Sequence, residues 1–201
     1  YIIIMNKSTL IIYDWDDTLF PTTVITQHKN NESKREMSDL DNQVHKLLVK
    51  SLHLGYPIII TNATRSWIKD SANKYYPKTY SFIIKNNIPV ISAREFAKSN
   101  NVHDHMQWKN VTFKYFLTIL MNKNKNIKNL LSIGDAMYEK IALEQFGKTL
   151  NSNEQKSYIK TIKYISRPTI LNLLKENILI NNNLEHIISK NDHAEIYLQH
   201  M

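Results

Sequence analysis

Five short apolar runs alternate along the sequence with segments of helical periodicity, and polar residues follow each run at once. The runs cover residues 10–13, 57–60, 88–91, 130–133 and 161–165. Continuous apolar runs of this length are typical of strands that are buried on both faces of a parallel sheet. The pattern predicts an α/β fold, with a Rossmann-like parallel sheet of about five strands and helices on both faces.

Four apolar stripes at helical spacing lie between or after these runs, in residues 40–48, 113–121, 137–146 and 170–178. Ser38 and Asp41 resemble a capping box before the first stripe, and Gly55 fits the position just past its end. Gly147 is predicted to close the third helix and Pro168 to open the fourth. We expect all four stripes to face the core.

The length of 201 residues favours one compact domain spanning residues 1–201. Two polar stretches, 21–37 and 99–107, are predicted to be irregular loops or flap insertions. No apolar run approaches the ~20 residues of a membrane span. We therefore expect a soluble cytoplasmic protein with no membrane contact.

The chain has no cysteine, so a metal ion would have to be held by oxygen or imidazole ligands, which favours a hard cation. His103 and His105 could in principle bind zinc. A solvated loop is the preferred interpretation of this pair, because no third ligand lies near in sequence.

The net charge of +8 would suit a polyanionic partner such as nucleic acid. The lysines are scattered, however, and the chain is rich in Lys, Asn and Ile together, as AT-rich coding imposes. A nucleic-acid partner is therefore kept only as an alternative.

An acidic turn, Asp14-Trp15-Asp16-Asp17-Thr18, follows the first apolar run. Carboxylates at the mouth of a sheet need a partner, and a divalent cation would serve. Asp14 could then attack phosphorus, and a protonated Asp16 could supply a proton to the leaving oxygen. The alternative is a calcium loop or a solvated turn. Leu19 and Ile25 argue against an EF-hand, which requires Gly and Glu at those positions.

The pattern Asp14-x-Asp16-x-Thr18 after an apolar strand resembles the first signature of the haloacid dehalogenase superfamily. Three further signatures of that superfamily follow in order. They are a strand ending in Thr61-Asn62, a lysine for which Lys109 is the preferred candidate, and Gly134-Asp135 with Glu139. Lys85 and Lys98 compete with Lys109, and a helix cap is the competing interpretation of Thr61.

The resemblance implies a Rossmann-like fold and a set of site roles. It implies Mg²⁺ held by Asp14, the backbone carbonyl of Asp16, and Asp135. Glu139 would support these ligands without binding the metal itself. It also implies an aspartyl-phosphate on Asp14, charge neutralisation by Lys109, and substrate contacts from the residues Thr18, Thr61, Asn62 and Lys109. Trp15 and Trp67 are expected to pack beneath the site.

Asp16 favours phosphoester chemistry within the superfamily, because members that cleave carbon–halogen bonds lack an acid at this position. The short gaps between signatures predict little or no cap domain and an open site. The expected function is a magnesium-dependent phosphatase acting on a phosphomonoester, with a phosphorylated macromolecule among the admissible substrates. Two alternatives stay open: a catalytically silent module that binds a phosphorylated ligand or protein, and a phosphatase of nucleic-acid ends.

Overall fold

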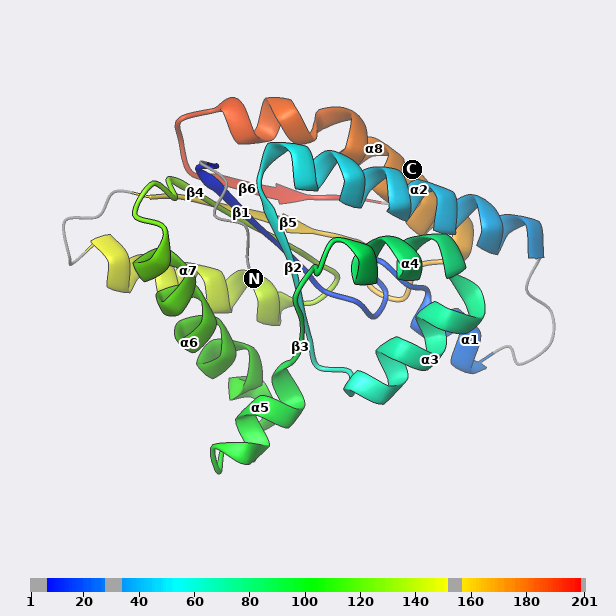
Figure 1. Cartoon of the computed structure of the whole chain (residues 1–201), viewed down its shortest axis with the longest axis horizontal. Helices are drawn as coiled ribbons and strands as arrows, with labels where there is room; N and C mark the ends of the chain where they lie inside the picture. The colour runs from blue at the N-terminus through cyan, green and yellow to red at the C-terminus, as the bar shows by residue number, and fades with distance from the viewer. Residues whose placement is uncertain (1–6, 28–33, 152–156, 200–201) are drawn as a thin grey trace.

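A computed structural model of the chain describes residues 7–27, 34–151 and 157–199 (Figure 1). Its strands form one six-stranded sheet, all parallel, in the order β3-β2-β1-β4-β5-β6. They are β1 (Thr9–Tyr13), β2 (Tyr56–Thr61), β3 (Val90–Ser92), β4 (Asn129–Gly134), β5 (Tyr158–Lys163) and β6 (Ala194–Tyr197). The predicted α/β class with a parallel sheet is confirmed.

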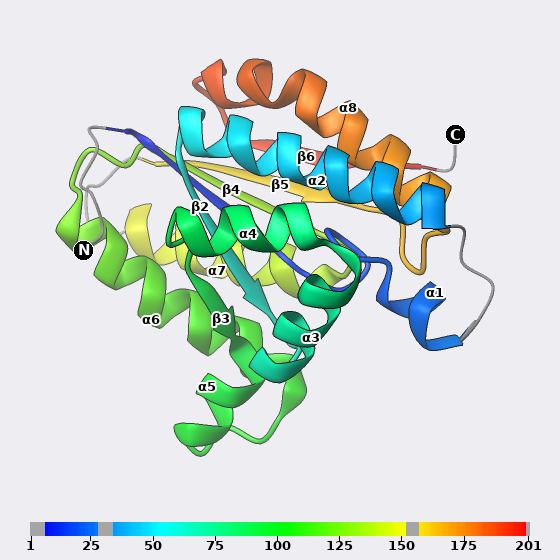
Figure 2. The same ribbon diagram turned by 45° about the vertical axis from the view of Figure 1, so that its right-hand side comes forward.

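Helices cover both faces of the sheet, as Figures 1 and 2 show. One face carries α1 (Thr22–Gln27), α2 (Lys34–Leu54), α3 (Arg65–Tyr75), α4 (Pro77–Lys85) and α8 (Ile170–Ser189). The other carries α5 (Ala93–Ser99), α6 (Trp108–Lys123) and α7 (Met137–Asn151), with the 3-10 turn η1 (His105–Gln107) before α6.

Side-chain alternation along the central strand divides the core into two layers. Ile11 and Tyr13 of β1 join the cluster under α2 and α8, whereas Leu10 and Ile12 join the cluster under α6 and α7. Successive residues of a strand point to opposite faces, so a continuous apolar strand can supply both layers. All five residues of β1 are buried, which explains why no polar residue interrupts this run.

The chain reverses its direction of winding across the sheet at the boundary between β1 and β4. From β1 it proceeds outward to β2 and β3, then crosses back to place β4 on the other side of β1. In open α/β sheets, ligands bind in the crevice beyond the carboxyl ends of the strands at such a switch point. The residues that follow β1 and β4 therefore define the expected site.

The sheet has one strand more than predicted, and two strands are shifted. The third and fifth predicted strands, 88–91 and 161–165, lie at Val90–Ser92 and Tyr158–Lys163. The unpredicted β6 pairs with β5 at the edge, and its residues alternate between half-buried and exposed. A four-residue edge strand that buries only one face gives no continuous apolar run.

Two helix boundaries differ from the predictions. Ser38 lies inside α2, and Asp41 accepts hydrogen bonds from the backbone amides of Lys78 and Thr79 at 3.1 and 2.9 Å, so it caps α4 instead. Gly147 lies inside α7, where a Cβ would come within 2.6 Å of Ile159, so close packing against β5 accounts for the glycine. Gly55 follows α2 directly, as predicted.

The two predicted irregular stretches have different outcomes. In the 21–37 stretch, Thr22–Gln27 is helical and α2 begins at Lys34, so the loop prediction is wrong there, while residues 28–33 lie outside the described part. In the 99–107 stretch, α5 ends at Ser99 and η1 follows a short irregular segment. Among the helices of the described ranges, none is both long and apolar enough to cross a membrane.

Candidate active site

The acidic turn after β1 folds into a tight loop at the carboxyl edge of the sheet. The backbone amide of Asp14 continues the ladder by donating to Ile133 of β4 at 2.9 Å. The amides of Thr18, Leu19 and Phe20 then converge on the carbonyl of Trp15 at 2.9–3.3 Å. Asp17 has a φ of 51°, a left-handed conformation that Asp tolerates better than most residues.

Lys109 lies at the centre of the site and is 1% exposed. Its Nζ is 2.7 Å from Oδ1 of Asp14 and donates a second hydrogen bond to the carbonyl of Ile60, at the end of β2. Burial lowers the pKa of the Lys109 ammonium, but the charges of Asp14 and Glu139 outweigh it, and the pKa ends above its ordinary value. Lys109 is therefore a buried cation.

Glu139 is the second carboxylate of this buried pair. Its Oε1 is 2.9 Å from Nζ of Lys109, and its side chain is 4% exposed. Gly134 makes the approach possible, because a Cβ on it would lie 2.7 Å from Oε2 of Glu139. Burial raises the pKa of the Glu139 carboxyl, against the opposing charge of Lys109. The structure thus places Glu139 directly on Lys109.

Asp16 is held by two donors from different helices. Thr22 Oγ1 and Trp67 Nε1 both donate to Oδ1 of Asp16, at 2.5 and 2.9 Å. Burial, followed by the charge of Asp14, raises the pKa of the Asp16 carboxyl to about 6. A carboxyl with a pKa in this range can both donate and accept a proton near neutral pH.

Asp17 and Thr18 support the loop. Asp17 accepts hydrogen bonds from the backbone amide of Thr23, at 2.8 Å, and from its hydroxyl. The Thr18 side chain is fully buried, and its carbonyl accepts a hydrogen bond from Asn177 at 3.1 Å. Thr18 therefore packs within the loop. A direct contact of its side chain with substrate stays a prediction.

Thr61 and Asn62 follow β2 beside the acidic loop. The Thr61 hydroxyl is buried and accepts a hydrogen bond from the amide of Ala63 at 3.2 Å. Asn62 Oδ1 is buried and accepts no hydrogen bond from the described residues. The N-cap of α3 is Thr64, whose hydroxyl accepts from the amide of Trp67. The helix cap is therefore Thr64, and the strand ends at Thr61.

Asp135 follows β4, the strand next to β1. Burial raises the pKa of its carboxyl to about 8, helped by the charges of Asp14, Glu139 and Asp17. The backbone carbonyl of Asp135 accepts a hydrogen bond from Ser166 at 2.7 Å, which ties the loop after β4 to the loop after β5. Burial and the neighbouring carboxylates therefore disfavour the ionised form of Asp135.

Three contacts of the site were not predicted from the sequence. Thr22 and Thr23 fall in the stretch that was expected to be irregular, and each binds a carboxylate of the acidic turn. Trp67 was expected to pack beneath the site, yet its indole nitrogen binds Asp16. Trp15 does pack beneath it: it is fully buried and stacks on Phe20 with ring centroids 5.7 Å apart.

Among the described residues, neither of the competing lysines forms an ion pair with a carboxylate of the site. Lys98 lies over the ring of Trp108 at 5.7 Å, and Lys85 ends α4. His105 contacts the rings of Trp108 and Tyr138 edge-on.

The donor set at the site fits magnesium better than zinc. Within residues 7–27, 34–151 and 157–199, no three His, Asp or Glu side chains gather closely enough to hold a metal on their own. Mg²⁺ needs no such cage, because it is bound through one or two carboxylates and keeps several waters. Asp14 and Asp135, with the carbonyl of Asp16, could supply that set. Burial, more than neighbouring charge, raises the pKa values of Asp16 and Asp135, and a bound cation would lower them.

Comparisons with protein-family models, with curated proteins and with solved structures gave no match. The site and the order of its motifs therefore carry the functional argument alone.

Proposed function

We propose that this protein is a magnesium-dependent phosphatase that cleaves a phosphomonoester through an aspartyl-phosphate on Asp14. The observation that carries the proposal is the 2.7 Å contact between Lys109 Nζ and Asp14 Oδ1, which joins residues 95 positions apart at the switch point of the sheet. A buried ammonium in contact with a carboxylate at the end of a central strand compensates the charge of that carboxylate. It also offers positive charge to an incoming phosphoryl group.

The roles follow from which oxygen atoms are already engaged. Lys109 holds Oδ1 of Asp14, so we assign the attack on phosphorus to Oδ2. As the Asp14–phosphorus bond forms, the bond from phosphorus to the leaving oxygen breaks, and that oxygen takes a proton from Asp16. Water then attacks phosphorus with Asp16 as base, which releases phosphate and restores the Asp14 carboxylate.

The pKa of about 6 supports both roles of Asp16, since the group has to give up a proton in the first step and take one in the second. Mg²⁺, when bound, would screen the repulsion between Asp14 and the phosphate dianion. Glu139 fixes the Lys109 ammonium from the far side, so that the ammonium stays directed at Asp14.

Thr61 and Asn62 are assigned to phosphoryl binding. Asn62 directly follows Thr61, the last residue of β2, next to the acidic loop, and its side-chain Nδ2 is a donor. An amide and a hydroxyl at such a strand end can donate to phosphoryl oxygens.

A phosphate-release assay tests the proposal. Purified protein would be incubated with an aryl phosphate, a phosphopeptide and a 5′-phosphorylated oligonucleotide, with Mg²⁺ and with EDTA. We expect release that requires Mg²⁺ and that Asp14→Asn abolishes. Release unaffected by Asp14→Asn would contradict the mechanism. Binding of these compounds without release from any would favour a phosphate-binding module instead.

A further inference from the structure

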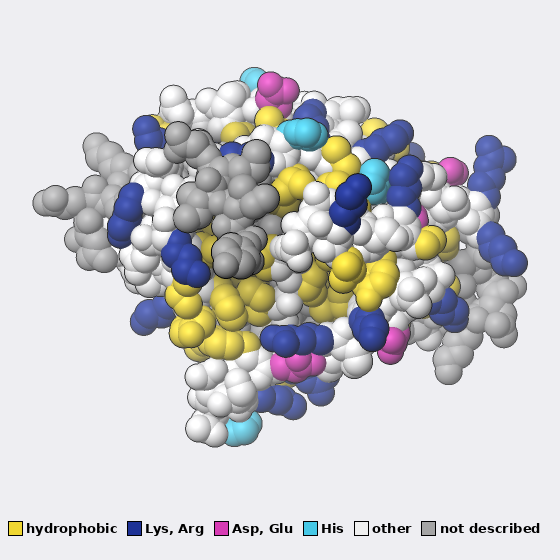
Figure 3. Space-filling model, viewed as in Figure 1, with side chains coloured by type: hydrophobic (Ala, Val, Ile, Leu, Met, Phe, Trp, Pro, Cys, Tyr) yellow, Lys and Arg dark blue, Asp and Glu magenta, His cyan; other side chains and the backbone are white. Residues whose placement is uncertain are grey.

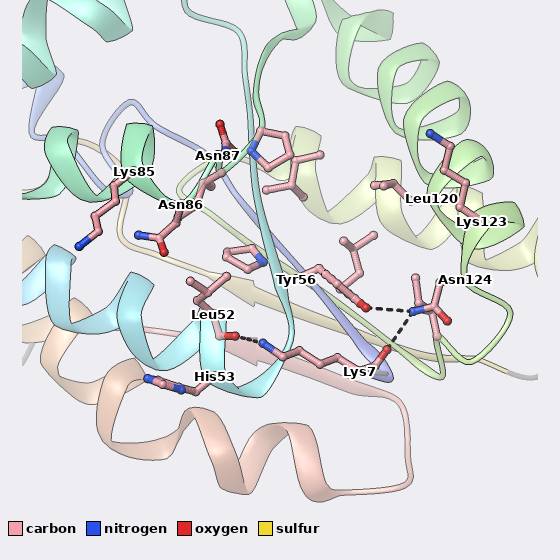
Figure 4. Close-up of a pocket in the computed structure, with 16 residues that line it drawn as sticks. Lys7, Leu52, His53, Tyr56, Lys85, Asn86, Asn87, Leu120, Lys123 and Asn124 are labelled. Atoms are coloured by element: carbon pink, nitrogen blue, oxygen red, sulfur yellow. Dashed lines mark hydrogen bonds between the residues drawn. The ribbon is translucent and has the colours of Figure 1, made fainter. Parts of the chain in front are cut away.

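A cavity of about 920 Å³ lies where β1 and β2 begin, at the edge of the sheet away from the acidic loop (Figure 4). Hydrophobic side chains gather over the middle of the face shown in Figure 3. Three lysines line the cavity, and each offsets the negative end of a helix dipole. Lys85 and Lys123 stand in the last turns of α4 and α6, and Lys7 donates to the carbonyl of Leu52 in the last turn of α2. The helix ends account for these cations without a ligand.

A second group of cations lies at the carboxyl edge of the sheet, beside the proposed site. Helix α5 begins where β3 ends, so Arg94 in its first turn stands at the same edge as the acidic loop. The Arg94 guanidinium and the Lys98 ammonium both lie over the ring of Trp108, at 5.8 and 5.7 Å from its centroid. Trp108 directly precedes Lys109 of the proposed site. The two cations therefore adjoin that site.

The fold does not neutralise these two cations. Arg94 and Lys98 are like charges four residues apart on one helix, an arrangement that is destabilising. Lys98 is in the last turn of α5, where the helix dipole favours a cation, but Arg94 is in the first turn, where the dipole disfavours one. Among the described residues no carboxylate pairs with either, because the neighbouring Glu95 binds Arg65. An aromatic ring attracts a cation and leaves its charge in place.

An exposed aromatic surface lies on the same two helices. Tyr115 of α6 is 52% exposed, and its ring contacts those of Phe96 and Phe116, with centroids 4.9 and 5.1 Å apart. Phe96 belongs to α5 and stands between the two cations in the sequence. Two neighbouring rings thus hold Tyr115, and half of its surface is open to a stacking partner.

We propose that the substrate phosphate is carried by the end of a single-stranded nucleic acid, which lies along α5 and the first half of α6. This inference rests on the proposed function, since the terminal phosphate has to reach Asp14. The phosphates behind it bind Arg94 and Lys98, and a base stacks on Tyr115. Single strands are bound by surfaces that combine cations with exposed aromatic rings. The net charge of +8 favours the same class of partner.

The test measures the binding of fluorescent oligothymidylates with a 5′- or a 3′-phosphate over a range of salt concentrations. EDTA is present to prevent hydrolysis, and a phosphopeptide of equal charge is the comparison. We expect both oligothymidylates to bind more tightly than the phosphopeptide, and the tighter of the two is used with the variants.

Arg94→Met combined with Lys98→Met should lower the slope of log affinity against log salt by about 1.4, because each phosphate contact to a single strand contributes about 0.7. Tyr115→Leu should weaken binding roughly tenfold at an unchanged slope, and Tyr115→Phe should bind like the wild type.

Lys125→Met combined with Lys128→Met is the matched control. Both lysines are exposed and precede β4 at the opposite edge of the sheet, and their replacement removes the same charge. Circular dichroism and the unfolding temperature would show that each variant is folded.

Phosphopeptide binding as tight as that of the oligothymidylates would overturn the inference. So would an equal loss of slope in the control variant, or unweakened binding in Tyr115→Leu. Phosphate release from an aryl phosphate by the wild type with Mg²⁺ reports the proposed function separately, because so small a substrate does not need this surface. Its absence would contradict the proposed function, and binding in EDTA would still decide whether this surface holds a single strand.

Discussion

The indole nitrogen of Trp67 donates a hydrogen bond to Oδ1 of Asp16 at 2.9 Å, and so connects helix α3 to the loop after β1. The Thr22 hydroxyl donates to the same oxygen. With Oδ1 accepting twice, the proton of the neutral carboxyl belongs on Oδ2. Trp67 thereby orients the acid that the proposed mechanism requires.

Trp67→Phe should therefore impair proton donation to the leaving group. We expect kcat for phenyl phosphate, whose leaving group needs a proton, to fall roughly tenfold, with a much smaller change for 4-nitrophenyl phosphate. Steady-state kinetics with both substrates measures this. Trp108→Phe is the control, because the Trp108 indole donates to the carbonyl of Val102 and not to Asp16. Equal losses on both substrates would point to a purely structural role for Trp67.

The buried group formed by Asp14, Lys109 and Glu139 predicts a strong effect on stability. Lys109→Met leaves two buried carboxylates without their cation, and we expect a loss of about 3–5 kcal/mol in the free energy of unfolding. Adding Glu139→Gln should restore part of the loss. Lys140→Met, which breaks the more exposed pairs with Glu144 and Glu195, should cost far less than Lys109→Met. Urea unfolding of the wild type, Lys109→Met, Glu139→Gln, the double variant and Lys140→Met measures these effects, and additive effects of the two single changes at Lys109 and Glu139 would contradict the coupling.

Glu176 predicts a pH dependence of stability that is unrelated to catalysis. It is buried in α8, accepts a hydrogen bond from the amide of Ile165 at 2.7 Å, and has its pKa raised by burial to about 7. Since the folded pKa lies above the ordinary value, the contribution of the neutral carboxyl is fully present below about pH 4.3 and is lost as pH rises through 7.

Glu176→Gln keeps an acceptor for Ile165 and removes this titration. We expect the variant to equal the wild type near pH 4 and to unfold at a higher temperature than the wild type at pH 8. Glu185→Gln, on the exposed side of the same helix, should follow the wild type at both pH values. A constant difference between Glu176→Gln and wild type across this range would contradict the assignment.

Magnesium should stabilise the folded chain even without substrate. A ligand present at ~100 times its dissociation constant adds about 2.7 kcal/mol to the free energy of unfolding. Asp135→Asn removes one of the two carboxylates assigned to the ion, and we expect it to abolish the rise in unfolding temperature. Asp70→Asn, an exposed change in α3, should leave that rise intact, and EDTA should reverse it. An undiminished rise in Asp135→Asn would remove Asp135 from the metal site.

The sequence predicted the parts of the site that depend on strand ends. Asp14 and Asp135 follow apolar runs, and parallel strands bring such residues to one edge, so their proximity needed no knowledge of side-chain packing. Lys109 could be selected among many lysines only by its place in the order of motifs. Its contact with Asp14 spans 95 residues and depends on where α6 begins.

Other contacts could not be predicted because they depend on how elements pack. Trp67 reaches Asp16 only through the position of α3, and Thr22 only because the turn after β1 continues into a short helix. The contact of Glu139 with Lys109 depends on the close approach at Gly134, and the support of the metal by Glu139 stays a prediction. The edge strand Ala194–Tyr197 buries too little to give an apolar pattern.

Trapping an acyl phosphate on Asp14 would test the proposed mechanism at its covalent step. The protein would be mixed with an aryl phosphate and Mg²⁺, quenched in acid, and treated with borohydride, which reduces an aspartyl-phosphate to homoserine. Peptide mass spectrometry should find homoserine at position 14, and none with EDTA or in Asp14→Asn. Turnover without homoserine at position 14, or with homoserine at another aspartate position, would contradict the proposed mechanism.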